Sequence, residues 1–167
     1  MSNFIRVLGE KIVSFPIIRP ARYHEAEIQK LVLEYLGIDD LGKLRDRFEG
    51  ESFYKNSLSK ILGLFSVNTF LEKVPFAISD IDLKTFVPYV EHNGMKFKIV
   101  VFDFGEFPII QKNEDLPIIF VIKKTHLEFL IAGYATLDQI SNPENCEDTG
   151  TNRRVYKSLK TLNTLKK

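Results

Sequence analysis

The residues best suited to chemistry lie close together at positions 79–85, where the sequence reads Ser-Asp-Ile-Asp-Leu-Lys-Thr. If this segment is a strand, alternate side chains share a face, so Asp80, Asp82 and Lys84 project together. Two carboxylates can bind a hard divalent cation through oxygen. The cation acidifies a water, and the lysine can hold that water or help to deprotonate it beside a scissile phosphate. The grouping therefore predicts metal-assisted phosphodiester hydrolysis, and the alternative is a solvated strand face.

The elements that must position this segment change in character after Pro75. Upstream, apolar residues at i, i+3, i+4 and i+7 predict a helix over 23–36, and Gly37 is a plausible stop. Residues 39–71 predict two further helices, broken near Gly50, and the first 20 residues predict a short strand or an irregular lead-in.

Downstream of Pro75, short segments rich in β-branched and aromatic residues predict strands, separated by turn signals such as Asn93-Gly94. We expect a small helix over 136–140, a polar loop over 142–152 and a last helix over 153–165. The order of helices followed by a mainly mixed sheet predicts an α+β or mixed α/β fold. The predicted strands cover 76–78, 81–90, 96–104, 116–123 and 129–135.

Several common catalytic signatures are absent from the sequence. It contains no Gly-x-x-x-x-Gly-Lys-Ser/Thr phosphate loop, no Gly-x-Gly-x-x-Gly fingerprint and no Gly-x-Ser-x-Gly elbow. His24-Glu25 begins a zinc-protease pattern, but Ile28 occupies the position of the second histidine. These absences weaken nucleotide hydrolysis, Rossmann oxidoreduction, serine hydrolysis and zinc proteolysis as functions.

The triplet Asp82-Leu83-Lys84, in its context of helices and later strands, resembles the PD-(D/E)xK nuclease superfamily over about residues 23–140. The resemblance implies a restriction-endonuclease-like mixed β-sheet flanked by helices. It also implies an Mg²⁺-dependent endonuclease acting on double-stranded DNA, with Mn²⁺ as a possible substitute. The role it implies is that of a type II restriction or homing-type endonuclease, working as a homodimer or homotetramer.

The resemblance also implies an acidic residue upstream of the triplet and a glutamate on a preceding helix. Asp80 is only two residues before Asp82, whereas Glu72 is ten before and suits the usual gap better, so both remain candidate metal ligands with Asp82. On the first helix, Glu25 flanks the apolar stripe and is the catalytic candidate, whereas Glu27 points further towards solvent.

Asp103 lies between bulky apolar neighbours on a predicted strand. A carboxylate there is costly unless it is paired or bound to a metal. We therefore take it as a further candidate metal ligand, or as the partner of a lysine such as Lys98. His24, His92 and His126 are scattered along the chain, and we assign none of them a role.

The chain carries 23 Lys and Arg against 22 Asp and Glu, a net charge of +1. Residues 151–167 alone carry +6 with no acidic residue, which leaves −5 for the remainder. Such a basic segment suits phosphate contacts driven partly by counterion release, and the alternative is a solubilising terminus. The candidate nucleic-acid-binding residues are Arg153, Arg154, Lys157, Lys160, Lys123 and Lys124.

The length of 167 residues predicts one nuclease-like domain over 1–150 with a basic C-terminal helix or tail over 151–167. The single cysteine, Cys146, excludes an intramolecular disulfide framework. The longest apolar runs have seven residues, far below the roughly 20 that span a bilayer. We therefore expect a cytoplasmic protein with no membrane partner. The alternative functions are non-catalytic nucleic-acid binding on the same fold and Holliday-junction-type resolution.

Overall fold

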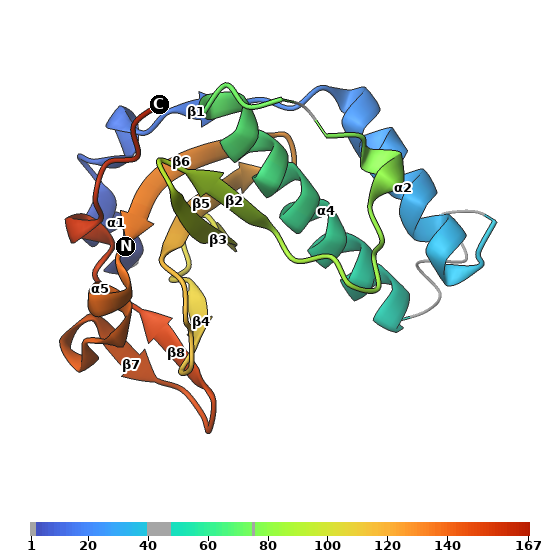
Figure 1. Cartoon of the computed structure of the whole chain (residues 1–167). Coiled ribbons are helices and arrows are strands. Elements are labelled where there is room, and N and C mark those ends of the chain that lie inside the picture. The colour runs from blue at the N-terminus through green and yellow to red at the C-terminus, as the bar shows by residue number, and fades with distance from the viewer. Residues whose placement is uncertain (1–2, 40–47, 75) are drawn as a thin grey trace.

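A computed structural model describes residues 3–39, 48–74 and 76–167 of the chain (Figure 1). Its α-helices are α1 (Asn3–Leu8), α2 (Arg22–Leu36), α4 (Phe48–Phe70) and α5 (Leu137–Ser141), and its 3₁₀ turns are η1 (Ile12–Ser14), η2 (Ile78–Asp80), η3 (Pro143–Asn145) and η4 (Leu159–Thr161). Its strands are β1 (Ile17–Ile18), β2 (Tyr89–His92), β3 (Met95–Asp103), β4 (Ile109–Gln111), β5 (Ile118–Thr125), β6 (Glu128–Ala135), β7 (Cys146–Asp148) and β8 (Arg153–Tyr156).

The main sheet has five strands in the order β1-β6-β5-β3-β2. β3 and β5 run parallel, whereas the β2–β3, β5–β6 and β1–β6 pairs are antiparallel. The connection between the parallel strands contains β4, which leaves the main sheet and joins a second, three-stranded sheet in the order β4-β8-β7. The architecture is therefore α+β with a mixed sheet, as the sequence predicted at that level.

Each face of the main sheet carries its own hydrophobic core. Alternating residues of β5 divide between the two, because successive side chains of a strand point to opposite faces. Ile119 and Val121 pack with α2 and α4, whereas Ile118, Phe120 and Ile122 pack with α1, the second sheet and the C-terminal segment. Figure 1 shows α4 lying across the first face with α2 beside it. The nearly continuous apolar run of β5 reflects burial on both faces.

Gly63 allows α4 to approach β3 closely. A Cβ placed on Gly63 would collide with a methyl group of Val101, so a larger residue would force the helix and the strand apart. This close contact limits how far α4 lies from the sheet near the carboxyl ends of β3 and β5.

The first predicted helix is confirmed: α2 ends at Leu36, and Gly37 follows in the left-handed conformation with φ 68°. The predicted break near Gly50 is wrong, because α4 runs through that glycine without interruption. Burial of Gly50 and of the apolar face of α4 outweighs the local cost of one glycine. Residues 40–47, where part of the other expected helix would fall, lie outside the described residues.

Three of the predicted strands are confirmed, with end points that differ by one or two residues: they are β3, β5 and β6. The predicted short helix is α5, which Thr136 caps by accepting a hydrogen bond from the backbone N–H of Gln139. The predicted strand over 76–78 is wrong, because η2 forms at 78–80 instead. The predicted strand over 81–90 is also wrong in its first part, since only 89–92 form β2.

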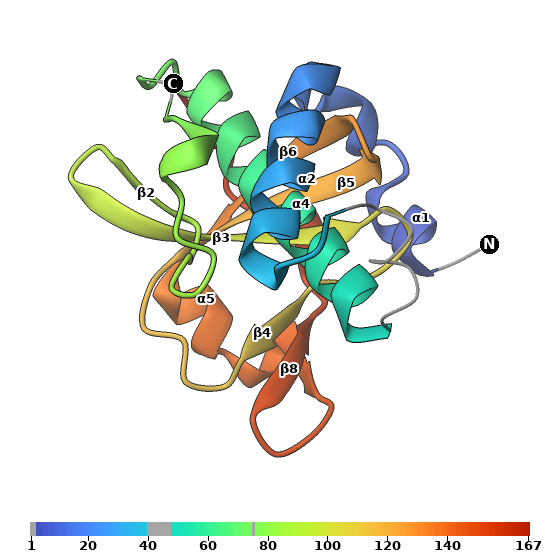
Figure 2. The same ribbon diagram turned by 90° about the vertical axis from the view of Figure 1, so that its right-hand side faces the viewer.

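The predicted C-terminal helix over 153–165 is wrong. Residues 153–156 form β8 between β4 and β7, and 159–161 form η4. Tyr156, Leu159 and Leu162 are buried in the second core, so packing against the sheet decides the local structure rather than helix propensity. Figure 2 shows β8 beside β4, where the second sheet projects away from α2. Among the described residues, no helix is long and apolar enough to cross a membrane.

Candidate functional site

The residues of the predicted motif lie in an exposed turn rather than on a strand. Asp80 is the last residue of η2, and the irregular turn that follows contains Asp82 and Lys84. Oδ1 of Asp82 accepts a hydrogen bond from the backbone N–H of Lys84 at 3.0 Å. This local bond offers the backbone an alternative to a strand ladder. The prediction that positions 80, 82 and 84 share one strand face is therefore wrong. We call residues 79–85 the motif turn.

Two of the predicted side chains nevertheless share a hollow. Asp80 and Asp82 both line an open depression of about 750 Å³ beside Leu64 of α4 and Phe86. Lys84 is exposed and is not among the residues that line it. The motif turn thus brings two carboxylates together but leaves its lysine outside the depression.

Glu25 and Glu72 lie apart from the motif turn's hollow. Glu25, in the first turn of α2, is half-buried, and its Oε2 lies 3.9 Å from Nε2 of His126. Glu72 follows α4 with φ 57°, and its Oε1 is 3.3 Å from Nζ of Lys167. Neither residue lines the hollow of Asp80 and Asp82.

A second group of charged side chains gathers where the parallel strands end. Asp103, the last residue of β3, lies opposite Lys123 of β5 in the ladder. In-register neighbours point to the same face, and Val101 and Val121, two residues earlier, pack in the core with α4. The side chains of Asp103 and Lys123 therefore both project from the α4 face of the sheet.

Asp103 and Lys123 line a cleft of about 490 Å³ between α4 and the ends of β3 and β5, which we call the carboxyl-end cleft. In sheets with parallel strands, ligands bind preferentially in the crevice outside the carboxyl ends. The polar and charged residues of this cleft are Ser52, Lys55, Asn56, Ser59, Asp103, Glu106 and Lys123.

Contacts within the carboxyl-end cleft position the lysine and leave the carboxylates available. Nζ of Lys123 donates a hydrogen bond to Oγ of Ser59 at 3.3 Å, so α4 holds the ammonium group. The expected pairing of Asp103 with Lys98 is not observed, because Lys98 binds Oε1 of the buried Glu114 at 2.8 Å. Among the described residues, neither Asp103 nor Glu106 has a side-chain hydrogen bond or ion pair.

The carboxyl-end cleft and the hollow of the motif turn share no lining residue. Within the described part of the chain, no group of three or more His, Cys, Asp or Glu side chains is placed to hold a metal ion. Each site thus offers at most two carboxylates. Sequence reasoning singled out Asp103 and Lys123 separately, but it missed Glu106 and Lys55, because nothing in the sequence says that β3 and β5 are parallel neighbours.

The predicted nucleic-acid-binding residues near the C-terminus partly face acidic partners in the second sheet. Arg154 and Lys112 both lie 3.2 Å from the carboxylate of Asp148, and Lys157 lies 3.1 Å from Glu147. The pair of Lys157 with Glu147 is exposed and therefore weak, so Lys157 can exchange partners, whereas Arg154 and Lys112 are partly buried. Three other predicted residues, Arg153, Lys160 and Lys124, are exposed.

His24, His92 and Cys146 have contacts that indicate structural roles. Nδ1 of His24 accepts a hydrogen bond from the backbone N–H of Ala21 and so caps α2. Nε2 of His92 lies 2.6 Å from the carbonyl oxygen of Lys166 and ties down the C-terminus. Burial raises the pKa of the Cys146 thiol, which disfavours the thiolate needed for nucleophilic catalysis.

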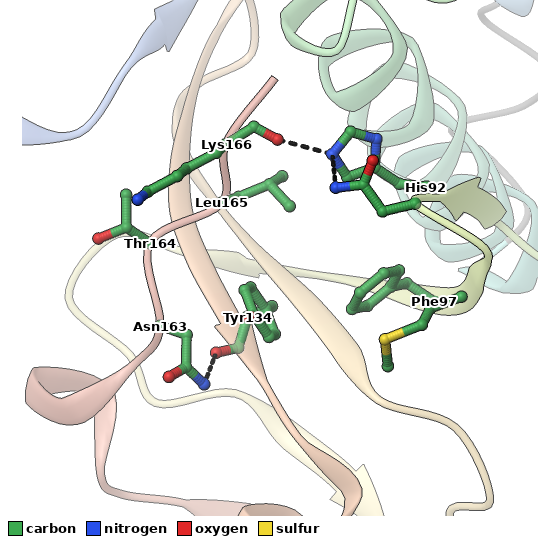
Figure 3. A pocket seen from close by; sticks show the side chains of 9 residues that line it. His92, Phe97, Tyr134, Asn163, Thr164, Leu165 and Lys166 are labelled. Atoms are coloured by element: carbon green, nitrogen blue, oxygen red, sulfur yellow. Dashed lines mark hydrogen bonds between the residues drawn. The ribbon is translucent and has the colours of Figure 1, made fainter.

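Figure 3 shows the hollow beneath this C-terminal segment. Tyr134 of β6 and Phe97 of β3 form its aromatic floor in an edge-to-face contact with ring centroids 5.5 Å apart. Asn163 pairs with Tyr134 through both backbone groups and donates its side-chain amide to the Tyr134 carbonyl. The hydrogen bonds drawn there join the chain to itself, so we interpret this hollow as a packing seam.

No protein-family model matches the chain, and neither curated proteins nor solved structures provide a match.

Proposed function

We propose that this chain is a metal-dependent endonuclease that hydrolyses phosphodiester bonds in double-stranded DNA. The observation that carries the proposal is the carboxyl-end cleft, where Asp103 and Glu106 lie beside Lys123 and Lys55 at the ends of two parallel strands. Opposite charges from three elements thus meet in one accessible cleft.

The carboxylates fit a hard divalent cation. Asp103 and Glu106 are exposed and without side-chain partners among the described residues, so their oxygens are available as ligands. Mg²⁺ is commonly held by one or two carboxylates and substrate phosphates, and it retains several waters. When bound, the cation would supply an acidified water and offset phosphate charge.

The lysines fit the phosphate. Lys123 is half-buried and held by Ser59, so its ammonium group is positioned before substrate arrives. A preorganised cation that faces the developing negative charge stabilises the transition state more than the ground state. Lys55 is exposed, and its ion-pair partner among the described residues is Glu51 on its own helix at 3.2 Å, a weak contact that a phosphate can replace.

Several charges along one side of the molecule favour a nucleic-acid substrate over a small phosphate ester. Lys55 of α4 and Lys123 of β5 both line the cleft, so basic side chains reach it from two elements. Each phosphate contact releases counterions, which makes binding depend strongly on salt. The choice of duplex DNA follows from the resemblance of Asp82-Leu83-Lys84 to the nuclease motif.

The test is cleavage of supercoiled plasmid, linear duplex, single-stranded DNA and a four-way junction, in Mg²⁺, in Mn²⁺ and in EDTA. We expect duplex cleavage that requires the metal and falls about 100-fold or more in Asp103→Asn and Lys123→Ala. Glu91→Gln and Lys30→Ala, at exposed positions outside the cleft, are the matched controls. Salt-dependent binding without cleavage of any DNA would refute the endonuclease and favour the non-catalytic alternative. Preference for the junction would favour a resolvase.

A further inference from the structure

β3 is longer than the strand that covers its outer edge. β2 pairs only with residues 95–98, although β3 continues to Asp103. One more bond, from the N–H of Ile99 to the carbonyl of Pro88 at 2.9 Å, ends the contact. Within the described part of the chain, residues 100–103 have no strand on this side, which leaves a template for another strand.

The backbone groups that point to this open edge can be identified. Lys98 and Phe104 donate to carbonyls of the β5 segment, so even-numbered residues of β3 face β5. Ile99 donates to Pro88, so odd-numbered residues face the other side. The N–H and C=O of Val101 and the N–H of Asp103 therefore point outward, and the described residues provide them with no backbone partner.

The register of the β2–β3 hairpin determines which residues would fill these positions. Tyr89 pairs with Lys98, and Pro88 bonds to Ile99. Continuing the same antiparallel ladder places residue 86 opposite 101 and residue 84 opposite 103. Both are hydrogen-bonded pairs of the same kind as 88 and 99, so their donors and acceptors match the open groups. Pro88 has no N–H, which explains why the ladder stops there.

The carboxyl-end cleft provides space for the additional strand. Four consecutive residues of β3, 100–103, line it. Side chains alternate between faces, so four consecutive residues reach one cleft only where the edge of the strand is exposed. The cleft therefore runs along the open edge and not only over the end of the sheet.

We propose that residues 84–87 add to the open edge of β3 and complete a single divalent-cation site in the carboxyl-end cleft. Lys84 then lies opposite Asp103, and Asp82 follows on the same face, so Asp82 joins Asp103 and Glu106 around the metal beside Lys84 and Lys123. The inference rests on the proposed function, whose cation and phosphate it assigns to one assembled site.

The chain's own segment is the natural occupant of this edge. Pro88 already holds residues 84–87 at the end of the ladder, so pairing is intramolecular and has a high effective concentration. In the observed conformation the carboxylate of Asp82 accepts from Lys84, and Thr85 donates to the Asp82 carbonyl at 3.2 Å. Strand addition replaces these turn bonds with ladder bonds and frees the Asp82 carboxylate for the cation.

Amide hydrogen exchange of the full chain, followed by NMR, tests the strand addition directly. On adding Mg²⁺ and a short DNA duplex, exchange at Val101 and Asp103 should slow at least tenfold, whereas Val100 and Phe102, which face β5, should change little. Pro88→Thr restores the missing donor and should slow exchange at Val101 without metal. Unchanged exchange in both experiments would overturn the proposal, as would protection that grows with protein concentration, which indicates a second copy on the edge.

Mn²⁺ titration by calorimetry tests whether Asp82 of the motif turn and Asp103 of the carboxyl-end cleft bind the same ion. Asp82→Asn and Asp103→Asn should each weaken the same ion at least tenfold, whereas Glu91→Gln should not. Loss in only one of the two variants would overturn the shared site and leave the endonuclease standing. Conversely, protection and shared metal binding without DNA cleavage in any buffer would refute the endonuclease and leave the assembled site standing.

Discussion

The motif turn and the carboxyl-end cleft contain the same chemical groups, carboxylates and lysines, but different forces position them. In the motif turn, groups two residues apart along the chain share a hydrogen bond at 3.0 Å and remain exposed. In the cleft, Asp103 and Lys123 are 20 positions apart in sequence, and the parallel ladder sets them side by side. The difference shows that spacing along the chain supplies a reactive pattern, whereas the sheet supplies preorganisation.

The largest expected effect tests whether the motif turn and the carboxyl-end cleft form one catalytic centre. If they form a single centre, Asp82→Asn and Asp103→Asn each reduce DNA cleavage by about 100-fold or more, and the double variant is little worse than either. The losses of activity caused by mutating residues that act as a unit do not add, because one mutation already disables the unit. Initial rates of plasmid nicking measure the effect. If the rate reduction in the double variant equals the product of the two single reductions, the two regions act independently.

The next effect concerns the helix that forms one wall of the cleft. Gly63→Ala adds a methyl group that collides with Val101, so we expect a loss of about 1–3 kcal/mol in the free energy of unfolding. Gly150→Ala is the control, because a Cβ at that position meets no atom within 4 Å. Urea denaturation measures both variants. Equal stability of the two would contradict the close contact between α4 and β3.

A smaller effect separates the cations of the cleft from those of the second sheet. Lys123→Ala should weaken binding of an uncleaved duplex several-fold in Ca²⁺ and reduce the salt dependence by about one counterion. Lys157→Ala should change affinity less, because Lys157 already pairs with Glu147 at 3.1 Å. Fluorescence anisotropy at several salt concentrations measures both. The opposite ranking would move the DNA contact to the second sheet.

The smallest effect concerns the motif turn itself. Asp82→Ala removes the acceptor for the Lys84 N–H and should lower the free energy of unfolding by about 0.5 kcal/mol. Asp82→Asn keeps a carbonyl acceptor and Lys84→Ala keeps the backbone donor, so neither should change stability measurably. Thermal unfolding of the three variants measures these stabilities. A Lys84→Ala variant less stable than Asp82→Ala would contradict the expectation.

Local sequence patterns predicted the elements in which local propensity and tertiary packing favour the same structure. α2 combines an apolar stripe with a terminal Gly37. β5 is rich in β-branched residues and β6 in apolar ones, and these side chains are buried in both cores. In contrast, residues 153–165 carry no strong breaker, yet they form β8 and η4 because Tyr156 and Leu159 fill the second core. That choice depends on partners far away in sequence, which periodicity does not encode.

The sequence by itself determined the inventory of this protein: an α+β order of elements, the close carboxylates Asp80 and Asp82, and a separate Asp103 at the end of an apolar strand. Only the tertiary structure decided which of these groups meet. The parallel pairing of β3 with β5 placed Asp103 beside Lys123, and Gly63 set the helix close enough for Ser59 to hold that lysine. Proximity between distant residues comes from strand register and packing, and no spacing along the chain specifies either.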